Sequence, residues 1–64
     1  MVKINGQQLE IAGMTLAAYL ASTEYDPKRI AVERNGDIVP KAAYSETTLM
    51  DDDQVEIVSF VGGG

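Results

Sequence analysis

Two Asn-Gly pairs constrain the fold of this chain more than any other sequence feature. Asn5-Gly6 and Asn35-Gly36 each fit a two-residue type I′ turn, which requires positive φ angles at both positions. Strand-like residues flank the first pair, with Val2 and Ile4 before it and the alternating residues 8–11 after it. The first pair therefore predicts a β-hairpin, and the second predicts another.

The second hairpin and the last run of the chain supply the remaining strands. Apolar residues at positions 30, 32, 38 and 39 flank Asn35-Gly36, and Pro40 should end that strand because proline has no amide donor. Residues 54–61, QVEIVSFV, form the most strand-like run and are apolar on both faces toward its end. A strand covered on both faces is usually central, so we expect this run in the middle of the sheet.

A helix is predicted between the two hairpins. Thr15 is a suitable N-cap for a helix over residues 15–22, and apolar residues at 16, 19 and 20 form one stripe. Pro27 disfavours helical geometry at the preceding residue, so the helix should end by about residue 25. A helical turn is expected around residues 42–44. One helix on a mixed sheet of four to five strands is an α+β fold, with residues 1–64 as a single domain.

The composition narrows the classes of function. With 45% hydrophobic and 23% charged residues the chain should fold, and with no cysteine or histidine it lacks a disulfide framework and the usual zinc ligands. A net charge of -5 disfavours nucleic acid and anionic membranes as partners. No signal peptide or membrane-spanning run is evident, so a cytoplasmic location is expected.

The chain offers little side-chain chemistry for catalysis. Without histidine, no imidazole is present to activate Ser22, Ser45 or Ser59, so an enzyme acting alone is not expected. Residues 51–53, three successive aspartates, suggest a calcium or magnesium site, but they lack the spaced ligands and the distal glutamate of an EF-hand loop. We therefore interpret them as a solvated turn, with no metal site.

The reactive group that remains is the terminal carboxylate of Gly64. Residues 61–64, VGGG, can pack little, so we expect a flexible tail that a partner grips. At about 3.5 Å per extended residue the tail reaches roughly 14 Å, about the depth of an enzyme pocket. The carboxylate is a poor electrophile and would need activation by an ATP-dependent partner. The alternative is a frayed end or a cloning remnant.

With these features the chain resembles the ThiS family, the sulfur carriers of thiamin biosynthesis within the ubiquitin-like β-grasp group. The resemblance covers the whole chain. Its features are the first strand running into Asn5-Gly6, the helix of residues 15–22, "VERNGDIVP" at 32–40 and "DDDQVEIVSFVGGG" at 51–64. The last is the most specific, because a strand of this type running into terminal Gly-Gly is that family's signature.

The resemblance implies a protein cosubstrate rather than an enzyme, with no bound cofactor of its own. In that family an E1-like adenylating enzyme of the ThiF type uses ATP with magnesium to adenylate the terminal glycine. A persulfide from a sulfur-donor enzyme replaces AMP, and the thiocarboxylate then gives its sulfur to a thiazole synthase of the ThiG type. Carried onto this chain, Gly64 bears the adenylate and the thiocarboxylate, while Gly62 and Gly63 thread the partner's channel.

The partner interface is expected on the sheet face that the helix does not cover. By strand alternation Val55 and Ile57 lie under the helix, which leaves Val58 and Phe60 on the opposite face. A single helix covers only one face, so the second face should be open. The alternative is that Phe60 packs as ordinary core under the segment around Tyr44.

Two other functions remain open at this point. The related carrier of molybdopterin synthesis shares the Gly-Gly end but is usually longer and elaborates the middle of the domain. A ubiquitin-like modifier that attaches to lysine, or a passive interaction domain, belongs to a different class. The short chain and the Phe60-Val61-Gly62 ending favour the thiamin carrier.

Overall fold

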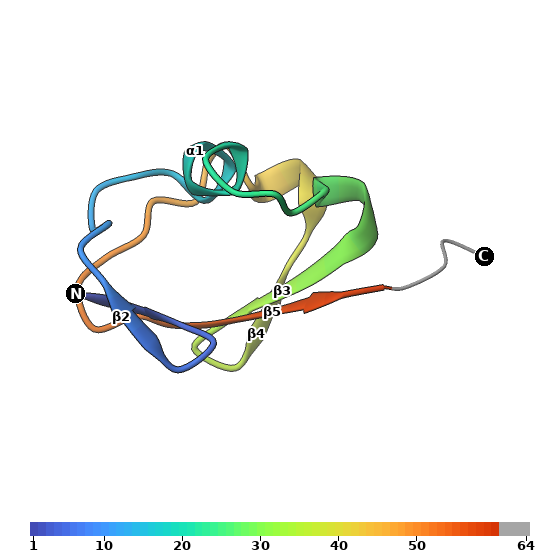
Figure 1. Cartoon of the computed structure of the whole chain (residues 1–64). Helices are drawn as coiled ribbons and strands as arrows, with labels where there is room; N and C mark the ends of the chain where they lie inside the picture. The colour runs from blue at the N-terminus through green and yellow to red at the C-terminus, as the bar shows by residue number, and fades with distance from the viewer. Residues whose placement is uncertain (61–64) are drawn as a thin grey trace.

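Two β-hairpins flank a central strand in the computed structural model, which describes residues 1–60. The first hairpin is β1 (Val2–Ile4) with β2 (Gln7–Leu9), the second is β3 (Ile30–Arg34) with β4 (Asp37–Val39), and β5 spans Gln54–Ser59. The strand order is β2-β1-β5-β3-β4 (Figure 1). β5 runs parallel to β1 and antiparallel to β3, so the sheet is mixed and its last strand is central, as expected.

The hairpin turns have the predicted backbone conformation. Asn5 and Gly6 have φ angles of 50° and 85°, and Asn35 and Gly36 have φ angles of 53° and 88°. Positive φ at both central residues is the requirement of a type I′ turn, and asparagine followed by glycine meets it at low cost. Both Asn-Gly pairs therefore set the hairpins that the sequence predicted.

One α-helix covers one face of the sheet (Figure 1). Helix α1 spans Leu16–Ala21, its N-cap Thr15 accepts a hydrogen bond from the backbone N–H of Ala18, and Ser22 is the C-cap. Two short 3-10 helices, η1 (Pro27–Arg29) and η2 (Lys41–Ala43), lie in the connections. The second of these is the helical turn expected near residues 42–44.

The core lies between α1 and the sheet. Leu16 and Leu20 of the helix are each 1% exposed, and the loop residue Leu49 is fully buried beside them. The sheet contributes alternate residues of β1, β3 and β5, and Tyr44 is also a buried member of the cluster. The buried hydrophobic residues are Val2, Ile4, Leu16, Leu20, Ile30, Val32, Tyr44, Leu49, Val55 and Ile57.

Two strands end earlier than the sequence predicted. β2 ends at Leu9 rather than at Ile11, because the chain bends there toward Gly13, whose φ is 96° and whose N–H donates to the Leu49 carbonyl. β5 ends at Ser59. The expected tail of residues 61–64 lies outside the described residues. Within residues 1–60, no helix has the length and apolar character needed to cross a membrane.

Candidate functional site

Successive residues of β5 face opposite sides of the sheet. Val55 and Ile57 point into the core and are 1% and 5% exposed. Val58 and Phe60, which point the other way, are 57% and 53% exposed. The orientation expected from strand alternation is therefore observed, and Phe60 does not pack under Tyr44 as core.

The sheet face that carries Val58 and Phe60 is here called the open face. The strand register places Ala31 opposite Val58, Glu33 opposite Glu56, and Ile38 on the other side of Glu33. Ile38 is 65% exposed. The open face thus has apolar side chains from β3, β4 and β5 at one end. Its members are Lys3, Gln8, Ala31, Glu33, Ile38, Gln54, Glu56, Val58 and Phe60.

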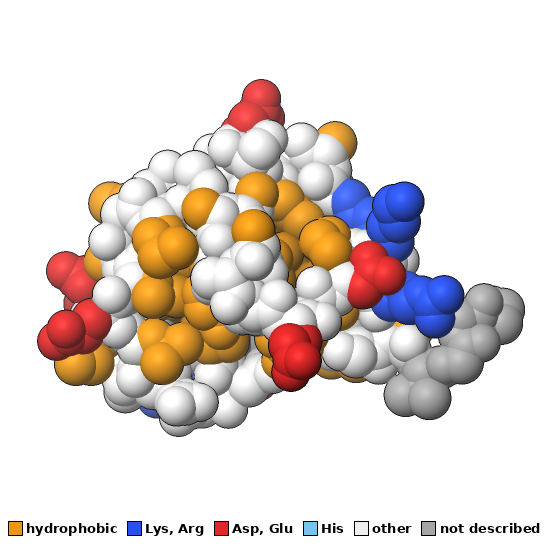
Figure 2. All heavy atoms as spheres, turned by 45° about the horizontal axis from the view of Figure 1, so that its top comes forward, with side chains coloured by type: hydrophobic (Ala, Val, Ile, Leu, Met, Phe, Trp, Pro, Cys, Tyr) orange, Lys and Arg blue, Asp and Glu red, His pale blue; other side chains and the backbone are white. Residues whose placement is uncertain are grey.

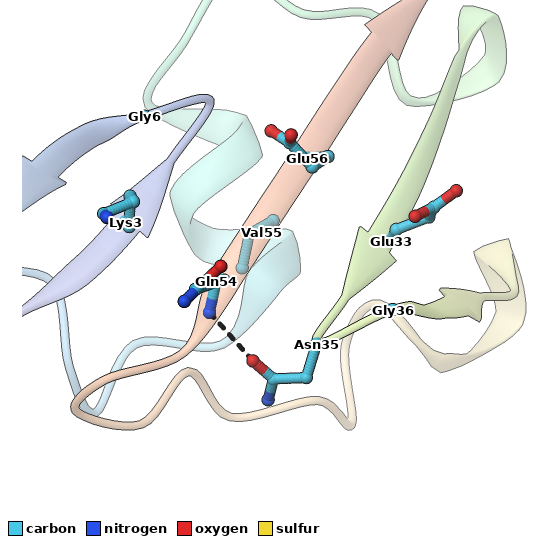
Figure 3. Close-up of a pocket in the computed structure, with 8 residues that line it drawn as sticks. All are labelled: Lys3, Gly6, Glu33, Asn35, Gly36, Gln54, Val55 and Glu56. Carbon is cyan, nitrogen blue, oxygen red and sulfur yellow. Dashed lines mark hydrogen bonds between the residues drawn. The ribbon is translucent and has the colours of Figure 1, made fainter.

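A groove of about 550 Å³ crosses the other end of the open face, between the two hairpin turns (Figure 3). Gly6 and Gly36 belong to its two walls, and a Cβ atom added to either would meet nothing within 4 Å. The residues that line it are Lys3, Gly6, Glu33, Asn35, Gly36, Gln54, Val55 and Glu56. Most of the side chains that line the groove are therefore polar or charged, and the groove lies beside exposed apolar residues of the same face.

The asparagines of both turns also hold β5 in place, which the sequence did not predict. The Asn5 carboxamide accepts a hydrogen bond from the Ile57 N–H at 2.7 Å and donates to the Ile57 carbonyl at 3.0 Å. These bonds continue the β1–β5 ladder past the end of β1. The Asn35 carboxamide accepts from the Gln54 N–H at 2.9 Å (Figure 3). β5 is thus held by side chains from both hairpins.

The interpretation of residues 51–53 as a solvated turn is wrong for Asp53. Its side chain is buried and accepts hydrogen bonds from Arg34 Nε at 2.8 Å, Asn35 Nδ2 at 3.0 Å and the Met50 N–H at 2.9 Å. Burial by itself raises the pKa of this carboxyl, but the three hydrogen bonds and the charge of Arg34 outweigh burial and lower the pKa. Asp53 is therefore an ionised group that ties the second hairpin to the start of β5.

The tyrosines belong to the structure of the domain. Tyr44 is 5% exposed and lies in the core, and Tyr19 is half-buried against it. Burial raises the pKa of the Tyr44 phenol and also that of Tyr19, where the neighbouring Tyr25 adds to the effect. Both phenols therefore stay neutral at physiological pH and are not candidates for proton transfer.

The charged side chains are unevenly placed. Figure 2 views the helix side and shows Lys and Arg side chains together at the right-hand end, where β5 stops in Figure 1. There the Phe60 N–H donates to the Arg29 carbonyl, which places Lys28 and Arg29 of η1 beside the end of β5.

Among residues 1–60, no three His, Cys, Asp or Glu side chains are arranged to hold a metal ion.

The predicted site residues divide into two groups. Val58 and Phe60 lie together on the open face, at the end of β5 from which the chain continues to residue 61. Gly62, Gly63 and Gly64 lie outside the described residues. The residues that sequence reasoning missed are Glu33, Ile38 and Glu56, whose proximity follows from strand register.

Comparison with known proteins identifies the family of this chain. The ThiS family matches residues 2–64. The sulfur carrier protein ThiS of Bacillus subtilis is 41% identical over 66 aligned residues that cover 100% of both chains. Thiazole synthases of Paramagnetospirillum magneticum and Magnetococcus marinus are 45% and 39% identical, over 95% and 98% of this chain. The alignments cover 19% and 20% of these synthases, so the chain spans about a fifth of their length.

Solved structures agree with the sequence comparison. The crystal structure of the thiamine biosynthesis protein ThiS from Geobacter metallireducens superposes with a TM-score of 0.78 at 27% identity, covering 98% of this chain and 97% of that one. The solution structure of a thiamine biosynthesis protein from the same organism gives a TM-score of 0.75 at 28% identity, covering 98% and 86%. The β-grasp fold expected from the resemblance is confirmed, and the chain belongs to the ThiS family.

Proposed function

We propose that this chain is a sulfur carrier for the thiazole ring of thiamin and that Gly64 carries the sulfur as a thiocarboxylate. The observation that carries the proposal is the full-length match to the sulfur carrier protein ThiS of Bacillus subtilis, at 41% identity. The fold supports it, because the central strand β5 leads directly toward the glycines of residues 62–64. In this role the chain is a cosubstrate of other enzymes.

The chemistry requires activation of an unreactive group. A carboxylate oxygen of Gly64 attacks the α-phosphorus of ATP on a ThiF-type adenylating enzyme, and pyrophosphate leaves with magnesium. The terminal sulfur of a donor enzyme's persulfide then attacks the acyl carbon, and AMP leaves. A second thiol cleaves the resulting acyl disulfide and releases the thiocarboxylate. Gly62 and Gly63 have no side chains to obstruct a narrow channel that leads to this chemistry.

A thiazole synthase is the proposed acceptor of the sulfur. Two relatives named thiazole synthase contain a segment similar to this chain within a polypeptide about five times longer. In those proteins the carrier-like segment and the remainder of the synthase share one chain. The segment is therefore held at a high effective concentration near the remainder of the synthase. A separate carrier would need to bind the synthase. The ATP requirement is in keeping with the cytoplasmic location expected from the sequence.

The body of the domain should supply most of the binding energy toward the adenylating enzyme. Ordering four backbone residues costs on the order of 4 to 8 kcal/mol, which a few hydrogen bonds at roughly 1 kcal/mol each do not offset. Val58 and Phe60 are exposed apolar residues next to the start of the tail. We therefore propose that these two side chains form the apolar anchor of the interface.

Mass spectrometry of Gly64 distinguishes the proposed function from its alternatives. The chain is incubated with ATP, an adenylating enzyme and a persulfide donor, and pyrophosphate release is followed. Replacement of one oxygen by sulfur at Gly64 indicates the carrier, whereas an isopeptide remnant on other proteins indicates a modifier. Sulfur transfer from the thiocarboxylate to a molybdopterin precursor but not to thiazole synthase would identify the other carrier class.

Length at the C-terminus provides a second test. Removing Gly64, or adding one residue after it, moves the terminal carbonyl by about 3.5 Å, which a positioned nucleophile does not tolerate. Both variants should lose acceptor activity while the thermal unfolding midpoint stays nearly unchanged. Normal thiocarboxylate formation on the extended chain would contradict the mechanism.

A further inference from the structure

Glu33 of β3 and Glu56 of β5 are directly opposite each other in register on the open face. The register pairs them directly between β3 and β5. Side chains directly opposite in an antiparallel pair have Cβ atoms about 5 Å apart, and like charges in this position destabilise a sheet. Figure 3 shows both side chains at the groove between the hairpin turns, with the Glu56 carboxylate turned toward the Gly6 side and the Glu33 carboxylate turned away from it. The pair is therefore an exposed like-charge pair, in register, at the centre of the open face.

No cation of the described residues compensates the two carboxylates. Within residues 1–60 the ion pairs are Met1 with Asp51, Arg29 with Asp26, and Arg34 with Asp53. Lys3 lines the same groove but lies across β5 beside Gln54 and forms no ion pair in this part of the chain. Arg34, the next residue along β3, is turned to Asp53 on the other side of the sheet.

The groove is shaped to admit a side chain from outside. Its walls at Gly6 and Gly36 have no side chains, and open space surrounds the positions where a Cβ would lie. Ile38 borders Glu33 on β4, and Val58 follows Glu56 along β5 by two residues, so apolar surface adjoins the carboxylates on both strands. A basic side chain that entered here would have its charge paired and its alkyl part covered.

We propose that the groove receives an arginine of the adenylating enzyme, whose guanidinium binds Glu33 and Glu56 while Val58 and Phe60 dock beside it. This inference rests on the proposed function, because the partner is the enzyme that activates Gly64. Arginine fits better than lysine, since its planar guanidinium has donors for two carboxylates and its faces pack well against apolar groups. A net charge of -5 on the chain favours association with a basic surface.

The test compares two double variants with the same change in net charge. Glu33→Gln with Glu56→Gln removes the pair, and Glu24→Gln with Glu46→Gln removes two exposed carboxylates outside the sheet. Affinity for an adenylating enzyme that activates the parent chain is measured by calorimetry at about 0.05 M and 0.5 M salt. The first variant should bind ~10-fold or more weakly at low salt, with a smaller difference at high salt, while the control stays within about twofold.

The outcomes separate this proposal from the proposed function. Equal affinity of the two double variants at low salt would overturn the arginine proposal and leave the carrier function intact. If no adenylating enzyme activates the parent chain, the carrier function fails and this proposal fails with it. Thermal unfolding adds a check, because the variant without the pair should be at least as stable as the parent. Two further results would overturn the arginine proposal. One is magnesium or calcium binding by the parent but not by the variant without the pair, and the other is dimerisation that requires the pair.

Discussion

Ile57 and Val58 are neighbours in β5 with similar β-branched side chains, yet they belong to opposite faces of the sheet. Ile57 is 5% exposed and packs under α1, whereas Val58 is 57% exposed on the open face. Residue type therefore does not decide which apolar residues of this strand form the core. The difference arises because, within residues 1–60, a single α-helix covers one face of the sheet and leaves Val58 on the other face exposed.

The largest expected effect is on stability, from a change on the covered face. Ile57→Ala removes three buried carbon atoms and should lower the free energy of unfolding by about 2 to 5 kcal/mol. Val58→Ala, its matched control, should change it by less than about 0.5 kcal/mol because the side chain is already largely in water. Chemical denaturation of both variants measures the difference. Similar losses from the two changes would mean that the open face is covered in the free protein.

For binding to the adenylating enzyme, we expect a change on the open face to matter more than a change elsewhere on the surface. Phe60→Asp should leave the domain folded, because the ring is 53% exposed, but should weaken association with the adenylating enzyme. An aromatic anchor contributes about 2 kcal/mol or more, which is roughly a 30-fold loss of affinity. Titration of the enzyme with each variant measures the dissociation constant, and Met50→Asp is the control at another exposed apolar residue. An unfolded Phe60 variant, or a folded one with parental affinity, would rule out Phe60 as the anchor.

A second pair of neighbours shows the same contrast for polar groups. Asp52 is exposed, whereas the Asp53 carboxylate is buried among Arg34, Asn35 and the Met50 N–H. Asp53→Asn should cost about 2 kcal/mol at neutral pH, because a charged acceptor of three hydrogen bonds becomes an amide with a donor facing other donors. Asp52→Asn should change little. Urea unfolding at several pH values measures both variants.

The pH dependence of that difference follows from the lowered pKa of Asp53. A carboxyl whose pKa is lower in the folded state stabilises the fold above its unfolded pKa, about 3.9, and loses this contribution as the pH falls through the folded value. The stability gap between the parent and Asp53→Asn should therefore be constant near neutrality and narrow in acid below about pH 4. A gap that stayed constant into strong acid would mean that the charge of Asp53 does not contribute.

The parts of the fold that were predictable from the sequence follow from local patterns. The type I′ turns, the capped helix and the orientation of Val58 and Phe60 each depend on residues within a few positions of one another. The burial of Asp53 against Arg34 and Asn35 and the Glu33–Glu56 pair depend on register between segments 18 or more residues apart, which no local pattern encodes. Gly62 to Gly64 follow a strand that was predicted, and the residues themselves suggested Gly64 as the group to be activated, whereas the proposed thiocarboxylate chemistry comes only from the family resemblance.

The smallest expected effect concerns the Asn5 side chain, which connects the turn of the first hairpin to Ile57 in the middle of β5. Asn5→Gly keeps the positive φ of the turn, because glycine adopts it freely, but it removes both hydrogen bonds to the Ile57 backbone. We expect a loss of about 1 to 2 kcal/mol, since each net hydrogen bond contributes roughly 1 kcal/mol. Asn5→Asp keeps an acceptor for the Ile57 N–H, but its second carboxylate oxygen faces the Ile57 carbonyl, so this variant should also lose stability.

Amide hydrogen exchange locates this effect on the strand. In Asn5→Gly the Ile57 N–H should exchange faster, because its acceptor at 2.7 Å is gone, while the Val58 N–H, on the β3 side of the strand, should keep its protection. Asn5→Asp should leave the Ile57 N–H protected. If Ile57 exchanged at the parental rate in Asn5→Gly, the backbone of β5 would hold its position without the Asn5 side chain. In that case its backbone pairing with β1 and β3 would be sufficient to direct the strand toward residue 61.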